Sequence, residues 1–456
     1  MTFRSRLGNE TRATIRLALP LVAGQLCTVG MNVVETLLAG HRGGLTLAAV
    51  GVATPVWSIA LLVSMGLMLA VPPSVAQLAG AGRRDAIAVV FRQALWLAVV
   101  TGVLLLAGLR FGGELLRRAG VDAAIIPEAE AFLDLLAFGA PAQSLFLAAR
   151  GLSEGLGLTR PTMWFGLLGV LVLAPLGWAL MHGCAGLPAL GIRGLGLAYA
   201  IVLWTQALAM LAFLARHRNY RGLGLFACWQ WPHWPTISSL LGLALPMCFA
   251  LLMEGGLFVA TALMMGTLGP VAAAAHQVAI NVATVTFMVP LGVALAITVR
   301  VGQAVGQDDV AGVRWAGFTG IGLVFCVQVL SALVLALGAM PIAAAYTRDA
   351  AVAATAAQLL GYAALFQLAD GVQAASNGAL RGLKDTRVPA VLTVLSYWAV
   401  GMVCGAGLGF GHGLGAQGLW TGLIVGLVAA AVSLFWRFSV LARRAGWKRL
   451  ADDRAV

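Results

Sequence analysis

Long apolar stretches alternate with short polar segments along almost the whole chain. Each apolar stretch has about 20 residues or more, the length that a helix needs to cross the hydrocarbon core of a bilayer. Lipid offers the backbone no hydrogen-bond partner, so segments this long and apolar must be helices. We predict twelve spans, which are residues 14–38, 47–72, 89–111, 127–150, 161–182, 194–215, 240–265, 272–299, 313–338, 354–380, 388–410 and 416–440.

The apolar pattern occurs twice. The stretch "LALPLVAGQL" begins at Leu17, and the similar stretch "LALPMCFALL" begins at Leu243. The offset between these two positions also carries Gly66 onto Gly292. The sequence therefore predicts two six-helix lobes related by internal duplication, and an even number of spans gives both lobes the same orientation. The predicted parts are an N-terminal lobe (1–220), a cytoplasmic linker (221–239) and a C-terminal lobe (240–456).

Composition and charge support an all-α integral membrane protein. The chain is 61% hydrophobic and 10% charged, whereas soluble domains are about a quarter charged. Of its 29 Lys and Arg residues, 23 fall on one side of the predicted topology. The positive-inside rule places that side, with both termini, in the cytoplasm. This topology accounts for the net charge of +12, and we find no motif for binding nucleic acid.

Three acids lie well inside predicted spans, namely Glu35, Glu254 and Asp370. A charged side chain at the bilayer centre costs roughly 2.5–3.5 kcal/mol on insertion scales, so these acids must face a cavity or be protonated. Acids in this position are functional by default. The alternative is that each makes a buried polar contact between helices, and for Glu35, nearer its helix end, the two interpretations are evenly balanced.

Polar neighbours support a cavity. Residues at spacings of three and four share one helix face. The predicted polar faces are Thr28, Asn32 and Glu35 in the first span, and Asp370, Gln373 and Asn377 in the tenth.

Two prolines inside spans, Pro20 and Pro246, are expected to bend their helices. Gly255 and Gly256 follow Glu254 and allow close approach of a ligand or another backbone. A desolvated carboxyl group can exchange a proton, and it can equally hold Na⁺ through its hard oxygen atoms. Both ions remain open, with Na⁺ expected at Glu254 and Asp370 if it is used. Phe366, which has no hydroxyl, slightly favours protons.

Several other chemistries are excluded. The chain has two lysines and no GxxxxGK[ST] motif, so no P-loop binds a nucleotide. The histidines and six cysteines are dispersed without metal-ligand spacing. We therefore expect no cofactor, no metal site apart from the possible Na⁺ and no enzyme activity.

The stretches "NVVETLLAGHRGGLTLAAVGVA", "VAQLAGAGRR", "AAHQVA" and "LADGVQAASNGALRGLKDTRVP" carry a family resemblance. The chain resembles the multidrug and toxic compound extrusion (MATE) transporters, specifically the bacterial NorM-like branch, over essentially its whole length. The resemblance implies a V-shaped antiporter in the inner membrane, which expels amphipathic, often cationic drugs in exchange for H⁺ or Na⁺. It assigns cation coupling and substrate binding to Glu254 and Asp370. Glu35 stands where the family usually has Asp, and Pro20 matches a proline that bends the first helix.

Other functions remain as alternatives. A flippase or exporter of a lipid-linked or metabolite substrate would usually have a basic cavity, whereas the acids here favour cationic cargo. A channel or non-transporting scaffold would show rings of repeated polar residues from several subunits. We expect the chain to act as a monomer in the lipid bilayer, with small-molecule drugs or toxic cations as its partners.

Overall fold

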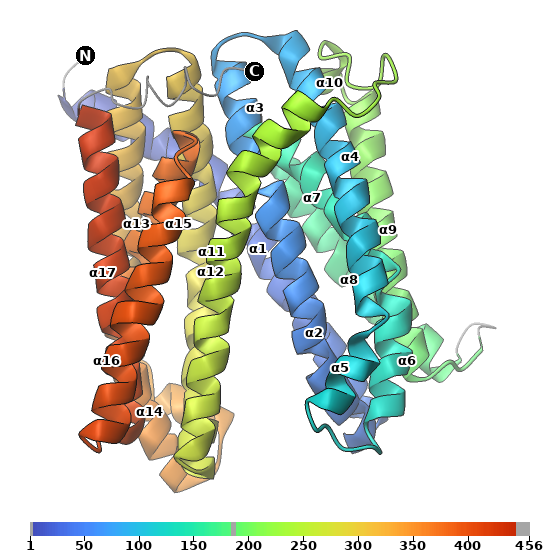
Figure 1. Ribbon diagram of the computed structural model, residues 1–456, viewed down its shortest axis with the longest axis vertical. Helices are drawn as coiled ribbons and strands as arrows, with labels where there is room; N and C mark the ends of the chain where they lie inside the picture. Colours follow the sequence, from blue (N-terminus) through green and yellow to red (C-terminus); the bar gives the residue numbers. More distant parts are fainter. Residues whose placement is uncertain (1–2, 184–187, 444–456) are drawn as a thin grey trace. The chain divides into compact units, whose positions relative to one another are not determined.

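The computed structural model describes residues 3–183 and 188–443, and this part of the chain is helical without a strand (Figure 1). Eleven helices in it are long and apolar enough to cross a membrane. A twelfth span results if two helices joined at a 45° bend, Ile126–Leu136 (α6) and Gly139–Gly155 (α7), are counted as one. The prediction of twelve spans is thereby confirmed.

The first half of the chain contains the remaining helices α1 (Phe3–Arg42), α2 (Gly44–Met68), α3 (Val71–Gly80), α4 (Arg84–Leu109), α5 (Gly112–Arg118), α8 (Arg160–His182), α9 (Ile192–Arg216) and α10 (Arg218–Arg221). The second half contains α11 (Trp234–Thr267), α12 (Pro270–Gly306), α13 (Val310–Tyr346), α14 (Ala350–Gly382), α15 (Arg387–Val394), the π-helical segment η1 (Leu395–Met402), α16 (Val403–Ala406), the π-helical segment η2 (Gly407–Gly411) and α17 (Gly415–Arg443). Gly43 and Gly269, which are equivalent under the repeat, separate the first two spans of each half with φ of 147° and 108°. Few side chains tolerate such angles.

Contacts divide the chain into two compact units. The N-unit comprises the described residues from Ala23 to Cys248, and the C-unit comprises those up to Val22 and from Phe249 onward. These units differ from the predicted lobes, because α1 and α11 each contribute to both. The two transition points, after Val22 and after Cys248, are equivalent under the repeat. Each follows its proline, Pro20 or Pro246, by two residues, and both prolines lie inside continuous helices.

In each unit, a glycine allows the close approach of α1 or α11, the helices that contribute to both units. In the N-unit, a Cβ atom added to Gly66 would lie 2.5 Å from the Cα of Cys248. In the C-unit, a Cβ atom added to Gly292 would lie 2.5 Å from the Val22 side chain and 2.8 Å from its backbone nitrogen. Both pairs are equivalent under the repeat, so the duplication has kept the same close approach in both units.

Gly292→Ala is therefore expected to destabilise the C-unit by about 1–3 kcal/mol, because the new methyl group overpacks against backbone. The control is Gly322→Ala, where a Cβ atom meets nothing within 4 Å. Thermal unfolding of the purified variants compares the two. Equal unfolding midpoints for both variants would contradict the close packing.

One helix lies at the centre of each unit. In the C-unit, α14 packs against α12, α13 and α17, and α17 also lies beside the span from α15 to η2 (Figure 1). In the N-unit, α7 packs against α3, α4 and α9. Gly378 allows the closest packing of α14, because a Cβ atom there would lie 2.4 Å from the carbonyl oxygen of Ala294 on α12. The buried helix α14 carries the polar face predicted in the tenth span.

Candidate cation and drug site

Glu254 on α11 and Asp370 on α14 both belong to the C-unit and interact electrostatically with one another. Asp370 is 5% exposed, and Glu254 is half-buried. The structure therefore brings together the two carboxylates that the resemblance assigns to cation coupling. On the same face of α14, Gln373 is buried and Asn377 is half-buried.

Arg381 joins this cluster, although the sequence interpretation placed it in a cytoplasmic loop. The predicted span ends at residue 380, but α14 continues to Gly382 and Arg381 is 7% exposed. Its Nε donates to the carbonyl oxygen of Asn377 at 3.4 Å, and its charge interacts with Glu254. The sequence spacing could have identified Arg381, because Asn377 and Arg381 follow Asp370 by seven and eleven residues and so lie on the same helix face.

The π-helical segment η1 supplies a tyrosine to the cluster. Tyr397 is buried and interacts with both Glu254 and Asp370. Its neighbour Trp398 donates from Nε1 to the carbonyl oxygen of Met253 at 3.1 Å. The ring of Trp398 also approaches Gly256, where a Cβ atom would lie 3.4 Å away. Wider π-helical turns often occur at functional sites, and here one holds Tyr397 beside the acids.

A polar network fixes α14 one turn before Asp370. Gln367 donates to the hydroxyl of Thr286 on α12 and accepts from Ser331 on α13 at 2.7 Å. The Gln328 side chain donates to the carbonyl oxygen of Gln367 at 2.9 Å. These bonds satisfy polar groups that burial would otherwise penalise, and they hold the helix that carries Asp370 against its neighbours.

An aromatic cluster borders the acids on the same helix. Phe366, one turn before Asp370, makes edge contacts with Phe258 and Trp420, with ring centroids 6.2 and 5.7 Å apart. Trp420 in turn contacts the buried His276, whose Nδ1 has no hydrogen-bond partner among the described residues. The helix of Asp370 thus carries polar residues at Gln373 and Asn377 and an aromatic contact at Phe366.

Glu35 lies in the N-unit, apart from the unit of Glu254 and Asp370. It is 2% exposed, with the Thr54 hydroxyl 3.2 Å from its Oε1, and it interacts electrostatically with Tyr199. Thr28 and Asn32 from the same predicted face are exposed, so Glu35 is the buried member of these three residues.

The N-unit also contains a buried ion pair that the sequence interpretation missed. Arg150 and Glu154 on α7 are 9% and 3% exposed, and Arg150 Nε donates to Glu154 Oε1. Arg150 also donates to Gln25 at 2.9 Å, while the Thr162 hydroxyl donates to Glu154 at 3.1 Å. Both charged residues stand at or just beyond the end of the predicted apolar span, although α7 continues to Gly155.

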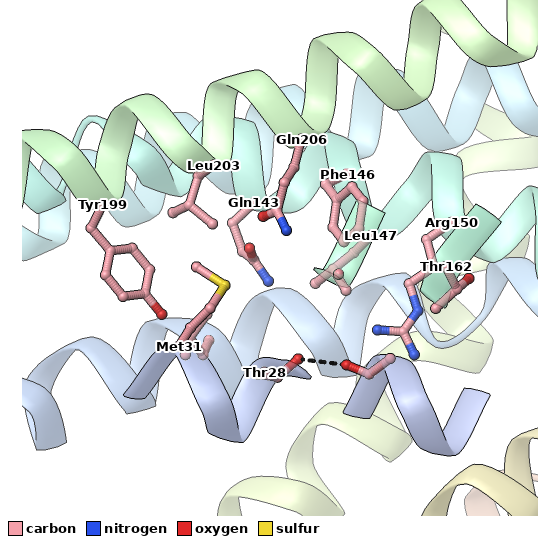
Figure 2. Close-up of a pocket in the computed structure, with 13 residues that line it drawn as sticks. Thr28, Met31, Gln143, Phe146, Leu147, Arg150, Thr162, Tyr199, Leu203 and Gln206 are labelled. Atoms are coloured by element: carbon pink, nitrogen blue, oxygen red, sulfur yellow. Dashed lines mark hydrogen bonds between the residues drawn. The ribbon is translucent and has the colours of Figure 1, made fainter. Parts of the chain in front are cut away.

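A small cavity of about 40 Å³ lies in the N-unit between α1, α7 and α9 (Figure 2). Figure 2 shows Arg150 at one end, Tyr199 at the other, and Met31 and Thr28 reaching it from α1. Such a volume holds about three water molecules. A drug would require the cavity to widen. Among residues 3–183 and 188–443, no group of three or more His, Cys, Asp or Glu residues is arranged to hold a metal ion.

Two stretches of the chain, residues 20–179 and 246–406, match the model of one protein family, MatE. The starts of the two matches, at residues 20 and 246, are themselves equivalent under the internal repeat. Together the two matches cover more than half of the chain. The chain belongs to the MatE family.

Curated MATE relatives align with nearly the whole chain. It is 48% identical over 439 residues to "Probable multidrug resistance protein NorM" of Xanthomonas campestris pv. campestris, covering 96% of both proteins. The protein of the same name from Xylella fastidiosa is 45% identical, over 96% of this chain and 94% of that one. "Multidrug resistance protein MdtK" of Yersinia enterocolitica is 36% identical, over 95% and 96%. The predicted NorM-like membership is confirmed.

Solved MATE structures share the fold. The eukaryotic MATE transporter AtDTX14 superposes with a TM-score of 0.89 at 19% identity, covering 98% of this chain and 99% of that one. An outward-facing MATE family transporter of the MOP superfamily gives 0.87 at 20% identity, over 95% and 96%. At this identity the likeness establishes the fold alone.

Proposed function

We propose that this MATE protein is a secondary active multidrug efflux transporter, which exchanges amphipathic, often cationic drugs for H⁺ or Na⁺. The observation that carries the proposal is the pair formed by the half-buried Glu254 on α11 and the buried Asp370 on α14, within one unit. Buried acids that retain polar neighbours mark ion and substrate pathways in membrane proteins. The names of the curated relatives, multidrug resistance proteins, support drugs as the cargo.

The proposed mechanism is alternating access. The protein alternates between two states, so that the carboxylates face one side of the membrane and then the other. Cation and drug need only favour opposite states for their movements to be coupled. In this scheme the ion loads Glu254 and Asp370 from outside, and the drug loads the protein from the cytoplasm.

Transport by purified protein in liposomes tests this function. A fluorescent cationic drug is loaded, and a pH gradient and then a Na⁺ gradient are imposed separately. Drug movement driven by either gradient establishes antiport and identifies the ion. If neither gradient drives movement through folded protein, the function is wrong, and a lipid or metabolite becomes the better substrate.

We also propose that the protein lies in the bacterial inner membrane with both termini in the cytoplasm. Within the C-unit, α1 begins and α17 ends at the same end of the unit (Figure 1). The excess of Arg and Lys near that side supports the cytoplasmic assignment. A tag at the N-terminus is expected to be labelled only after the inner membrane is permeabilised. Labelling from the periplasm of intact cells would reverse the topology.

A further inference from the structure

The buried charges of the C-unit cluster do not cancel when both acids are ionised. Glu254 and Asp370 contribute two negative charges, and Arg381 contributes one positive charge that no protein environment removes. Arg381 makes no ion pair within 4 Å among the residues that the structure describes. It lies eleven residues, or about 16 Å along the helix, beyond Asp370. The charge of Glu254 interacts with the charges of both residues.

The N-unit contains a buried arginine, Arg150, whose charge is neutralised locally, and it serves as a comparison for Arg381. When the two halves of the repeat are aligned with a shift of one further residue, Glu154 aligns with Arg381 and Arg150 aligns with Asn377. There the arginine is neutralised by a carboxylate one turn along its own helix, with Gln25 as a further partner. In the C-unit, α14 carries no acid at the equivalent of Arg150. The Arg381 charge is left to act on Glu254 from across the cluster.

We propose that Arg381 is a fixed internal cation of the Glu254–Asp370 site and limits that site to one monovalent cation at a time. This inference rests on the proposed exchange function and adds its stoichiometry and substrate charge. With Arg381 in place, one H⁺, one Na⁺ or one monocationic drug brings the cluster to neutrality. A second cation would leave an unbalanced positive charge in a low-dielectric site, which is costly. The exchange of one coupling ion for one monocationic drug is then electroneutral.

Equilibrium transport of the monocation ethidium in liposomes tests the wild-type protein directly. With the membrane potential clamped at zero, a tenfold gradient of the coupling ion should sustain about a tenfold ethidium gradient for one ion per dye, and about a hundredfold gradient for two. We expect the tenfold result, and no ethidium accumulation from a membrane potential alone. A hundredfold gradient, or potential-driven accumulation, would overturn the proposal.

Variants of Arg381 test whether this residue sets the number of coupling ions exchanged per ethidium. Arg381→Met should let the two acids take two ions, so exchange becomes sensitive to potential, whereas Arg381→Lys should retain the wild-type ratio. Arg314→Met is the control for loss of one charge, because Arg314, near the start of α13, donates to the carbonyl oxygens of Ala442 and Arg443 at the end of α17. Folded Arg381→Met that still exchanges one ion per dye would overturn the proposal.

Two further controls separate the possible failures. Within the described part of the chain, Arg381 and Tyr397 are the titratable groups that interact with Glu254 and Asp370. The contribution of the nearby His276 is tested by repeating the measurement in a pH gradient with His276→Gln. If wild-type protein transports nothing with any gradient, the proposed function fails by itself. Binding of ethidium to the purified protein in weak buffer, or in Na⁺, then still counts the ions released. One ion per dye supports the charge limit, and none or two contradicts it.

Discussion

Glu254→Gln is expected to abolish ion-coupled drug efflux while leaving the protein folded. The substitution keeps the size of the side chain and removes the charge that interacts with Arg381, Tyr397 and Asp370. Without that charge the cluster has no net negative charge left for a cation to balance. Efflux driven by the coupling-ion gradient should fall to the level of empty liposomes, at least about a hundredfold below wild type if the lost charge interaction is worth about 3 kcal/mol.

The matched control is Glu114→Gln, since Glu114 is an exposed acid that pairs with Arg117 and Arg118 at the surface of the N-unit. It should transport at the wild-type rate. Asp370→Asn tests the second carboxylate in the same assay and should also eliminate coupled efflux. Wild-type efflux from either site variant, at equal amounts of folded protein, would remove that residue from the coupling site.

Glu154→Leu is expected to destabilise the N-unit by about 3–5 kcal/mol, because it leaves the buried Arg150 guanidinium without its counter-charge. Arg150→Met with Glu154→Leu should recover most of this loss, since a buried ion pair can often be replaced by apolar side chains of similar volume. Thermal unfolding in detergent measures each variant. The recovery in the double variant distinguishes an uncompensated charge from a simple packing defect.

The control for this prediction is the exposed pair Arg118 and Glu114, which has the same spacing of four residues. Arg118→Met should leave the unfolding midpoint unchanged, because an exposed ion pair is weak and screened by solvent. A midpoint for Glu154→Leu equal to that of wild type would show that Arg150 finds another partner or reaches water. In that case the double variant should unfold at the same midpoint as Glu154→Leu.

The sequence could predict the part of the site that breaks an apolar pattern. Glu35, Glu254 and Asp370 interrupt long apolar runs, so each was visible as a charge inside a span, and the structure buries all three to different degrees. Arg381 and Glu154 stand where the apolar runs give way to polar residues, a position typical of loops. Their helices continue through them because hydrogen bonds and charges satisfy the side chains in place.

The sequence by itself determined the twelve helical spans, the duplication and the presence of acids in the membrane. Each of these depends on local composition or on spacing along the chain, and lipid enforces helices wherever apolar runs are long. Only the tertiary structure decided that α1 and α11 contribute to both units, and that Arg381 and Tyr397 join Glu254 and Asp370. Such contacts depend on how closely helices approach at glycines and on where buried charges find partners. The hydropathy of a single segment predicts neither property.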